Sequence, residues 1–268
     1  LESSDQFAEE IQYTFGEEWQ TFDQILPEHI KTFDYYFDLV EISQLRNSVV
    51  CDLGCGIGRW SYFLQSRCKS LVLVDFSEAI FVARRNLQDS DAVFIMADLN
   101  SLPFQDDFAD FLFSLGVLHH LPVPALDAVR RLRHSAPQIL IYLYYALDNR
   151  PVYFRLLLQC VTFTRYILSQ IRNGRIRIII TWLLAVLIYV PLIVLGRLVN
   201  PFKLSRYIPL YEGYANSSFK QIRQDVYDRF FTSIEQRYTR QEIMDLKDTF
   251  EEVEISNNIP YWHFLCKR

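Results

Sequence analysis

The chain has 268 residues, of which 50% are hydrophobic and 15% aromatic, and its formal net charge is −5 at pH 7. This length suits one large α/β domain or a medium domain with an insertion, and the apolar content argues against a disordered chain. The five cysteines show no paired CxxC spacing, which disfavours a disulfide framework and a zinc site. We therefore expect reduced thiols, a cytoplasmic location and no metal.

Residues 1–45 combine acidic and aromatic side chains at a spacing near 3.6, which predicts N-terminal helices. From Val49 onward, short apolar runs alternate with helical patterns, and the runs are nearly continuous, which is typical of parallel strands covered on both faces. The expected strands are 49–53, 71–75, 92–98, 108–116 and 138–145, and the expected helices are 59–68, 77–87 (with Ser77 as its cap) and 123–136. This rhythm predicts a doubly wound α/β fold.

Residues 239–250 show a helical pattern, and 251–257 and 261–268 read as two terminal strands. Two strands so close together predict an antiparallel hairpin added to the parallel sheet. Between the two halves of this pattern lies an insertion at 151–210. We therefore expect an N-terminal helical lid (1–45), a main domain (46–150 with 211–268) and the helical insertion.

Glycines at positions 54, 56 and 58 follow the first strand, whose last polar residue is Asp52. Glycine lets the backbone turn sharply and approach a ligand closely, and the helix that follows offers free N–H groups. A dinucleotide fingerprint requires a small residue where this chain has Arg59, so binding of a pyrophosphate is disfavoured.

Two further acids end strands at the same expected edge of the sheet. Asp75 closes the second strand, where its carboxylate is placed to accept hydrogen bonds from a ribose diol. Asp98 follows the third strand, where it can face an adenine edge. The pattern therefore predicts a nucleoside site.

Four motifs together resemble the Rossmann-like, class I S-adenosylmethionine-dependent methyltransferases: "DLGCGIGR", the strand-ending Asp75, "ADLNSLPF" and "FSLGVLHHLP". The resemblance covers about residues 45–145, and the last helix with its two strands agrees with the seven-stranded sheet of that family. "YTFGEEWQTF" and "DRFFTSIEQRYTRQEI" look more loosely like a bacterial subgroup of glycan or natural-product pathways. The resemblance implies S-adenosylmethionine as cofactor and S-adenosylhomocysteine as product.

Carried over by position, the resemblance implies a set of cofactor contacts. Gly54, Gly56 and the backbone around Cys55, next to Asp52, border the methionine part; Asp75 with Phe76 binds the ribose; Asp98 and Leu99 bind the adenine; Leu115 lies beside it; and Tyr13, Phe15 and Trp19 form a lid. Aromatic residues at helical spacing more often pack in a core, and that alternative stays open for the lid.

Methyl transfer from a sulfonium is an in-line displacement, so the protein acts mainly by alignment, and a hydroxyl acceptor also benefits from a general base. His119 and His120 follow the fourth strand near the ligand-binding edge, and we expect one of them to be the base. The alternative is that "HHLP" only shapes a turn. We expect His29, His134 and His263 to be structural or exposed.

The stretch from Pro151 to Tyr211 has eight basic and no acidic residues, so the rest of the chain carries −13. Within it, Ile178–Gly196 is uncharged and long enough to cross a membrane. Pro191, the arginines at both ends and the position of the terminal strands argue against a span. The insertion is then a cap over the acceptor pocket, or a set of helices in a membrane interface on anionic lipids. We favour a cap that also touches the membrane.

We therefore expect O-methylation of a hydrophobic or membrane-associated small molecule, by a cytoplasmic enzyme that can rest on the inner face of the membrane. Methylation of a sugar or glycan intermediate under a soluble cap is the first alternative. A cofactor-binding or membrane-interaction protein without catalysis is the second. Nucleic acid is disfavoured as a partner because aliphatic residues, rather than stacking aromatics and polar donors, interleave the cations.

Overall fold

The structure is a computed structural model that describes residues 16, 19, 21–99, 101–258 and 262–268. Contacts within the chain divide it into two compact units. Unit 1 holds the residues up to Tyr145 and from Ile234 onward, and unit 2 is Ala146–Ser233. Tyr13 and Phe15, two of the three expected lid residues, lie outside the described residues.

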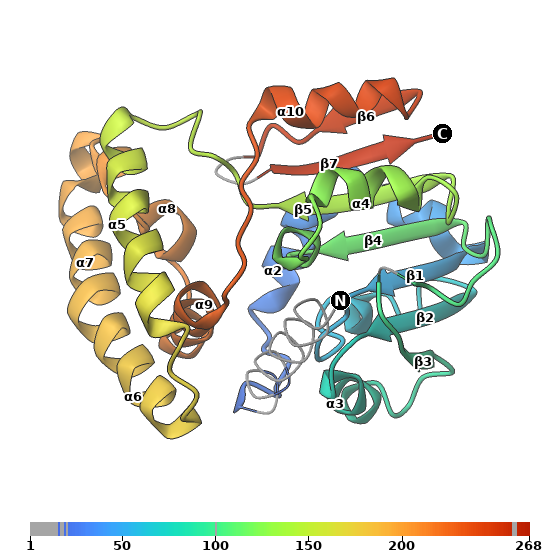
Figure 1. The fold of residues 1–268 in the computed structure, drawn as a ribbon, viewed down its shortest axis with the longest axis horizontal. Coiled ribbons are helices and arrows are strands. Elements are labelled where there is room, and N and C mark those ends of the chain that lie inside the picture. The colour runs from blue at the N-terminus through green and yellow to red at the C-terminus, as the bar shows by residue number, and fades with distance from the viewer. Residues whose placement is uncertain (1–15, 17–18, 20, 100, 259–261) are drawn as a thin grey trace. The chain divides into compact units, whose positions relative to one another are not determined.

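Unit 1 is built on a seven-stranded sheet with the order β3-β2-β1-β4-β5-β7-β6 (Figure 1). The five strands from β3 to β5 are parallel neighbours, and β7 is antiparallel to both β5 and β6. This confirms the mostly parallel doubly wound sheet and its antiparallel C-terminal pair. The strands are β1 (Val49–Leu53), β2 (Ser70–Asp75), β3 (Val93–Met96), β4 (Phe111–Leu115), β5 (Gln138–Leu143), β6 (Glu252–Ile255) and β7 (Trp262–Lys267).

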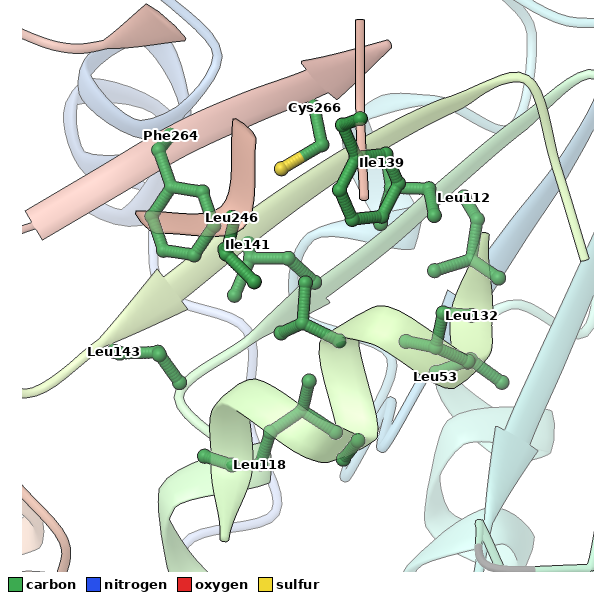
Figure 2. Packing of buried hydrophobic residues seen from close by; sticks show 14 of the residues in the cluster. Leu53, Leu112, Leu118, Leu132, Ile139, Ile141, Leu143, Leu246, Phe264 and Cys266 are labelled. Carbon is green, nitrogen blue, oxygen red and sulfur yellow. The ribbon is translucent and has the colours of Figure 1, made fainter. Parts of the chain in front are cut away.

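Successive side chains of a strand point to opposite faces, so the apolar strands feed two cores at once. On β5, Ile139, Ile141 and Leu143 belong to one core, whereas Leu140 and Tyr142 belong to the other. Figure 2 shows the first core, in which residues of β4, β5 and β7 pack against helical residues beside the sheet.

Helices cover both faces of the sheet. The first core is completed by α4 (Ala125–Leu132), α10 (Arg240–Met244) and the short 3₁₀ helix η7 (Asp245–Asp248). The second is completed by α2 (His29–Tyr36), the 3₁₀ helix η1 (Ile42–Asn47) and α3 (Ala79–Asn86). From β1 the chain adds β2 and β3 on one side of the sheet and then β4 and β5 on the other, so the strand order reverses at β1. Open α/β sheets bind ligands at such a reversal.

One expected helix is largely absent. Residues 59–68 form only the 3₁₀ turn η2 (Ser61–Phe63) between looser turns. The backbone N–H groups of Phe63 and Leu64 bond three residues back, to Trp60 and Ser61, so the segment winds more tightly than an α-helix.

Unit 2 is entirely helical in the described residues, and it is larger than the expected insertion. Residues 211–233, which we assigned to the main domain, belong to unit 2, because its last helix packs on the first two. Its elements are α5 (Val152–Leu168), α6 (Gly174–Leu184), the π-helical turn η4 (Ala185–Tyr189), α7 (Val190–Val199), the 3₁₀ turns η5 (Asn200–Phe202) and η6 (Ser205–Tyr207), α8 (Tyr211–Tyr214) and α9 (Phe219–Phe231).

Candidate functional site

The glycine loop leaves β1 in a conformation that only glycine adopts without strain. Gly54, Gly56 and Gly58 have φ angles of 76°, 52° and 75°. Space is short as well, because a Cβ on Gly54 would lie 2.4 Å from Cγ1 of Val117, and one on Gly58 would lie 2.6 Å from Cδ1 of Leu87. The first two amides of the turn, those of Gly54 and Cys55, both donate to the carbonyl of Val74 on β2.

Asp75 at the end of β2 holds this loop in place. Its Oδ2 accepts from the backbone N–H of Gly56 at 2.8 Å, and its Oδ1 accepts from the N–H and the hydroxyl of Ser77 at 2.8 and 2.7 Å. The hydroxyl of Ser77 in turn accepts from the N–H of Ala79 at the start of α3, as expected of a cap. Burial raises the pKa of Asp75, while the hydrogen bonds from Ser77 and Gly56 oppose that rise.

Asp52 lies one strand away and is almost completely buried. The hydroxyl of Ser61 bonds its Oδ2 at 2.6 Å. Burial, with a smaller contribution from the charge of Asp75, raises the pKa of Asp52 to about 8. The carboxyl is therefore mostly protonated at neutral pH and supports the loop as a neutral group.

The other expected cofactor residues lie along the same edge. Asp75 is the register partner of Met96 on β3, and Asp98 and Leu99 follow two and three residues later, exposed and half-buried respectively. Phe76 is half-buried next to Asp75, and Leu115 is buried at the end of β4, just before Gly116 with a φ of 82°.

Trp19 lies against the glycine loop. A Cβ on Gly56 would come within 3.0 Å of its ring, and the guanidinium of Arg59 stands 5.2 Å from the ring centroid. The same guanidinium stands 5.3 Å from the ring of Trp60. Arg59, the residue that breaks the dinucleotide fingerprint, is thus held between two indole rings beside the loop.

The two histidines differ sharply in their surroundings. His119 and His120 lie on the 3₁₀ turn η3 (Leu118–His120) after β4, and both are buried. Nδ1 of His120 lies 2.7 Å from the carbonyl of Ile234. Neither ring nitrogen of His119 has a hydrogen-bond partner among the described residues, and its ring stacks on Tyr144 with centroids 4.0 Å apart.

The surroundings of His119 also keep it uncharged. Burial lowers its pKa well below the usual value, and the nearby cationic sites of His120 and Arg237 lower it further. Arg237 is itself held over the ring of Tyr144, at 5.2 Å, and pairs with Glu235 at 2.6 Å. His119 is therefore a buried neutral imidazole with two available nitrogens.

Aromatic side chains that sequence reasoning missed gather beside His119. Tyr36 of α2 stacks on Tyr142 of β5 with centroids 4.9 Å apart, and Tyr142 lies 5.8 Å from Tyr144. The ring of His119 lies 6.1 Å from that of Tyr142. Tyr142 and Tyr144 are two residues apart in an extended segment, a spacing that places both side chains on one face of the sheet.

The sequence also did not predict that a buried histidine, His263, pairs with Asp38. His263 on β7 is the register partner of Tyr142 and is fully buried, which agrees with the structural one of its two expected roles, and its Nε2 lies 2.7 Å from Oδ1 of Asp38. Oδ2 of Asp38 accepts from the hydroxyl of Ser256 at 2.6 Å and from the amide of Asn258 at 2.5 Å. Nδ1 of His263 lacks a partner in the described part of the chain.

Within the residues that the structure describes, no group of three His, Cys, Asp or Glu side chains is placed to hold a metal ion. The edge instead offers backbone amides, the Asp75 carboxylate and neutral aromatic and imidazole rings. Such a set of groups suits an organic ligand with hydroxyl groups, together with a second, apolar molecule.

The order of the strands, the reversal at β1 and the glycine loop fixed by an acid define a Rossmann-like α/β domain with a ligand site at the carboxyl ends of its strands. Comparison with known families narrows this class. Residues 50–136 match the family described as "Methyltransferase domain". The match covers about a third of the chain and confirms, for this part, the resemblance to the class I S-adenosylmethionine-dependent methyltransferases that its motifs predicted.

Individual relatives match more weakly. Over 103 residues the chain is 34% identical to a tRNA U34 carboxymethyltransferase of Aliarcobacter butzleri (strain RM4018), which covers 36% of this chain and 34% of that protein. The chain thus spans about a third of the length of this curated relative.

Two methyltransferases are among the solved structures to which the chain is similar. Magnesium protoporphyrin IX methyltransferase from Synechocystis PCC 6803 with bound S-adenosylhomocysteine is 15% identical, with a TM-score of 0.48, over 89% of this chain and 81% of that one. An S-adenosylmethionine-dependent methyltransferase from Mesorhizobium loti is 20% identical, with a TM-score of 0.38, over 44% and 54%.

Proposed function

We propose that the protein binds S-adenosylmethionine at the carboxyl ends of β1 and β2 and transfers its methyl group to an oxygen of a hydrophobic small molecule. The observation that carries the proposal is the hydrogen bond between the Gly56 amide and Asp75, which joins the glycine loop to the acid that ends β2. A glycine-rich turn beside a fixed carboxylate is what a nucleoside with an attached amino-acid chain requires.

The residues present fit this cofactor. Gly54 and Gly56 allow the positive-φ turn whose backbone, with that of Cys55, would border its methionine part, and Asp75 offers carboxylate oxygens to its ribose hydroxyls. Asp98 and Leu99 supply a polar group and an apolar surface for the adenine. When bound, the cofactor supplies an electrophilic methyl group on a sulfonium.

The part of this chain in the reaction is alignment and proton removal. Fixing the acceptor against the methyl donor removes much of the entropic barrier of an in-line displacement. We assign the base to His119 rather than His120, because His120 is bonded to the carbonyl of Ile234 while both nitrogens of His119 are available. A neutral imidazole can take the proton that a hydroxyl loses, which typically accelerates such a step by about 10²–10⁴.

The acceptor class follows from the surroundings of His119. The rings of Tyr142 and Tyr144 lie next to His119, and Tyr36 stacks on Tyr142, which favours an apolar or aromatic acceptor over a free sugar. A sugar or glycan intermediate is the competing small molecule. An RNA acceptor is the competing class suggested by the name of the tRNA-modifying relative, and a protein that binds the cofactor without catalysis is the third alternative.

The location that we propose is the cytoplasm, with unit 2 as the part that meets the inner face of a membrane. The expected role of the insertion as a cap over the acceptor stays a prediction.

Calorimetric titration with S-adenosylhomocysteine tests the cofactor site directly. We expect micromolar binding to the wild type and binding at least about tenfold weaker to Asp75→Ala, because hydrogen bonds to a charged group contribute about 1.5–3 kcal/mol. Asp89→Ala changes an exposed acid after α3, is the matched control and should bind as the wild type does. Absence of binding to the folded wild type would overturn the proposal.

The acceptor is tested by transfer of an isotopic methyl group to three extracts in parallel: lipids, water-soluble glycans and RNA. We expect the wild type to transfer label to the lipid extract. The His119→Ala variant should transfer it at a much lower rate. Label in RNA or glycans would replace the acceptor that we propose, and label in none, together with tight cofactor binding, would favour the alternative without catalysis.

A further inference from the structure

Residues Gly174–Phe202 form a helix of 29 residues whose outer face is more apolar than its inner face. Among the described residues it is the one helix long and apolar enough to cross a membrane, with a mean hydropathy of 2.9 in its most apolar stretch, of which 22% is buried. The side chains of Leu187, Leu198 and Phe202 are 68%, 67% and 74% exposed. A surface helix in water shows the opposite pattern, with polar residues outward.

Two polar side chains in the first part of the same helix lie on its inner face. Thr181 is fully buried and Arg177 is 3% exposed. The guanidinium of Arg177 donates to the carbonyl of Ile171 at 2.6 Å and stands over the ring of Phe231 at 5.4 Å. Polar groups inside and hydrocarbon outside is the arrangement that proteins adopt against lipid.

The first helix of unit 2, α5, repeats the pattern. Its charged Arg165 is 7% exposed, whereas large apolar side chains such as Leu156, Phe163 and Tyr166 are 59%, 68% and 68% exposed. Most of the exposed large hydrophobic residues in the described chain lie on unit 2: Val152, Tyr153, Leu156, Leu157, Phe163, Tyr166, Ile167, Ile176, Ile179, Trp182, Leu183, Leu187, Ile188, Val194, Leu195, Leu198, Phe202, Leu204, Tyr207 and Phe219. Contiguous apolar surface on this scale marks an interaction site.

Exposed cations lie near both ends of the long helix, and its uncharged stretch Ile178–Gly196 contains none. Arg172 and Arg175 precede it, and Arg197, Lys203 and Arg206 follow it, all of them exposed. With no acid between 151 and 211, this charge complements anionic lipid headgroups. Trp182, with 48% of its surface exposed, is the kind of side chain that favours the boundary between headgroups and hydrocarbon.

The path of the chain through unit 2 decides whether the helix crosses the membrane or lies in its surface (Figure 1). The chain enters unit 2 near the end of α7, where Arg150 pairs with Glu212 and Tyr153 bonds the carbonyl of Tyr207. It leaves after α9, whose Phe231 lies against Arg177 near the start of α6. The two connections therefore start from opposite ends of the long helix.

Both connections nevertheless return to one place in unit 1. The N–H of Tyr238 donates to the carbonyl of Tyr144 at 2.9 Å, and Tyr145 and Tyr238 form an isolated parallel bridge, so the two linkers begin side by side. If the long helix crossed a bilayer, one linker would have to pass through hydrocarbon as extended backbone without internal hydrogen bonds. The bilayer core does not tolerate such a segment.

We propose that α5 and the helix Gly174–Phe202 lie in the plane of an anionic membrane surface, with Trp182, Leu187 and Leu198 turned into the acyl layer and the flanking arginines on the headgroups. This gives the membrane partner of the proposed function a defined face and depth. Binding to lipid needs neither cofactor nor acceptor, so its failure is distinguishable from a failure of methyl transfer.

Flotation of the full chain with phosphatidylcholine vesicles, with and without phosphatidylglycerol, is the first test. We expect binding that needs the anionic lipid and weakens with salt. Leu187→Glu and Leu198→Glu should each lower the bound-to-free ratio about tenfold or more, because each removes a buried side chain from lipid. Phe81→Glu, which changes an apolar residue 58% exposed on α3, is the matched control and should float as the wild type does.

The depth and orientation are tested on the same vesicles. Brominated acyl chains should quench tryptophan fluorescence in the wild type, and Trp182→Phe should remove the quenched component. In a Cys160→Ser background, a membrane-impermeant maleimide should label cysteines introduced at Gln170 and at Asn216, which lie toward opposite ends of the long helix, without detergent. Protection of one of the two would show a spanning helix and overturn the in-plane arrangement.

A second copy of this chain is the other candidate to cover the apolar face. Light scattering of the wild type in the absence of lipid distinguishes the two. A stable dimer that Leu187→Glu dissociates, or a folded wild type that does not float even at low salt, would overturn the proposal.

Discussion

The backbone N–H of Gly56 lies 2.8 Å from Oδ2 of Asp75, so the glycine loop after β1 and the acid that ends β2 form one unit. The same carboxylate takes two further hydrogen bonds from Ser77 at the start of α3. A ligand that bonds this carboxylate therefore meets a group whose position three donors have already fixed. Preorganisation of this kind reduces the cost of binding.

Asp75→Asn is expected to weaken binding of S-adenosylhomocysteine at least about tenfold. The amide keeps the size of the carboxyl, but its NH₂ group replaces one of the two oxygens and faces a donor, either Gly56 or Ser77. Only one oxygen then remains to accept the three hydrogen bonds from the Gly56 N–H and from the N–H and hydroxyl of Ser77. Calorimetry measures the loss, and Asp89→Asn is the control. Unchanged affinity would mean that Asp75 holds the loop without contributing to the ligand.

Gly54→Ala is expected to destabilise the domain by about 1–2 kcal/mol from its φ of 76° alone, and by more from the clash of the new Cβ with Val117. Urea unfolding measures the loss. Val117→Ala in the same chain removes the two Cγ atoms that lie 2.4 and 2.5 Å from the new Cβ, so the double variant should recover part of the loss and keep the backbone part. Equal losses in both variants would contradict the clash.

The parts of the site that the sequence predicted are those encoded by local patterns. The glycine loop, Asp52 and Asp75 follow apolar runs directly, and parallel strands bring their carboxyl ends to one edge of the sheet. Trp19 was predicted as part of a lid and lies against Gly56, but aromatic spacing alone does not separate a lid from a core.

The parts that escaped prediction depend on the assembled fold. Asp38 and His263 are 225 residues apart in the chain and meet only because β7 inserts beside β5. The outward apolar face of Gly174–Phe202 was equally out of reach, since composition shows how apolar a helix is but not which side its neighbours cover. Tyr142 and Tyr144 were missed for another reason, because their alternation within an apolar strand also fits an ordinary core.

Asp52→Asn is expected to stabilise the protein at neutral and alkaline pH. The folded-state pKa of Asp52 is raised from 3.8 to about 8, so this carboxyl contributes most to stability at low pH, and the contribution is lost as pH rises through about 8. The amide accepts the Ser61 bond without this penalty. Thermal unfolding should show the variant more stable at pH 8 by at least about 1 kcal/mol, and the difference should vanish toward pH 4.

His119→Ala is expected to lower turnover about 10²-fold while leaving the affinity for S-adenosylhomocysteine unchanged. Because burial lowers the pKa of His119 well below 6.5, the imidazole stays neutral as the pH falls, and the acid limb of the wild-type rate should lie below pH 6.5. His120→Ala is the comparison, and it should lose stability through its bond to the carbonyl of Ile234 rather than the chemical step. An acid limb that survives in His119→Ala would assign the base elsewhere.

Asp38→Ala is expected to destabilise the protein by about 1–3 kcal/mol, because it leaves the buried Nε2 of His263 and the hydroxyl of Ser256 without their acceptor. Burial lowers the pKa of His263 below 6.5 while Asp38 opposes the shift, so the variant lowers that pKa further. A depressed folded-state pKa means stability that is complete above 6.5 and lost as the pH falls, so the variant should lose stability more steeply on the acid side. Urea unfolding between pH 5 and 8 measures both effects, with Asp34→Ala, at an exposed acid on the preceding helix α2, as the control. Identical slopes for the two variants would contradict the coupling of Asp38 to His263.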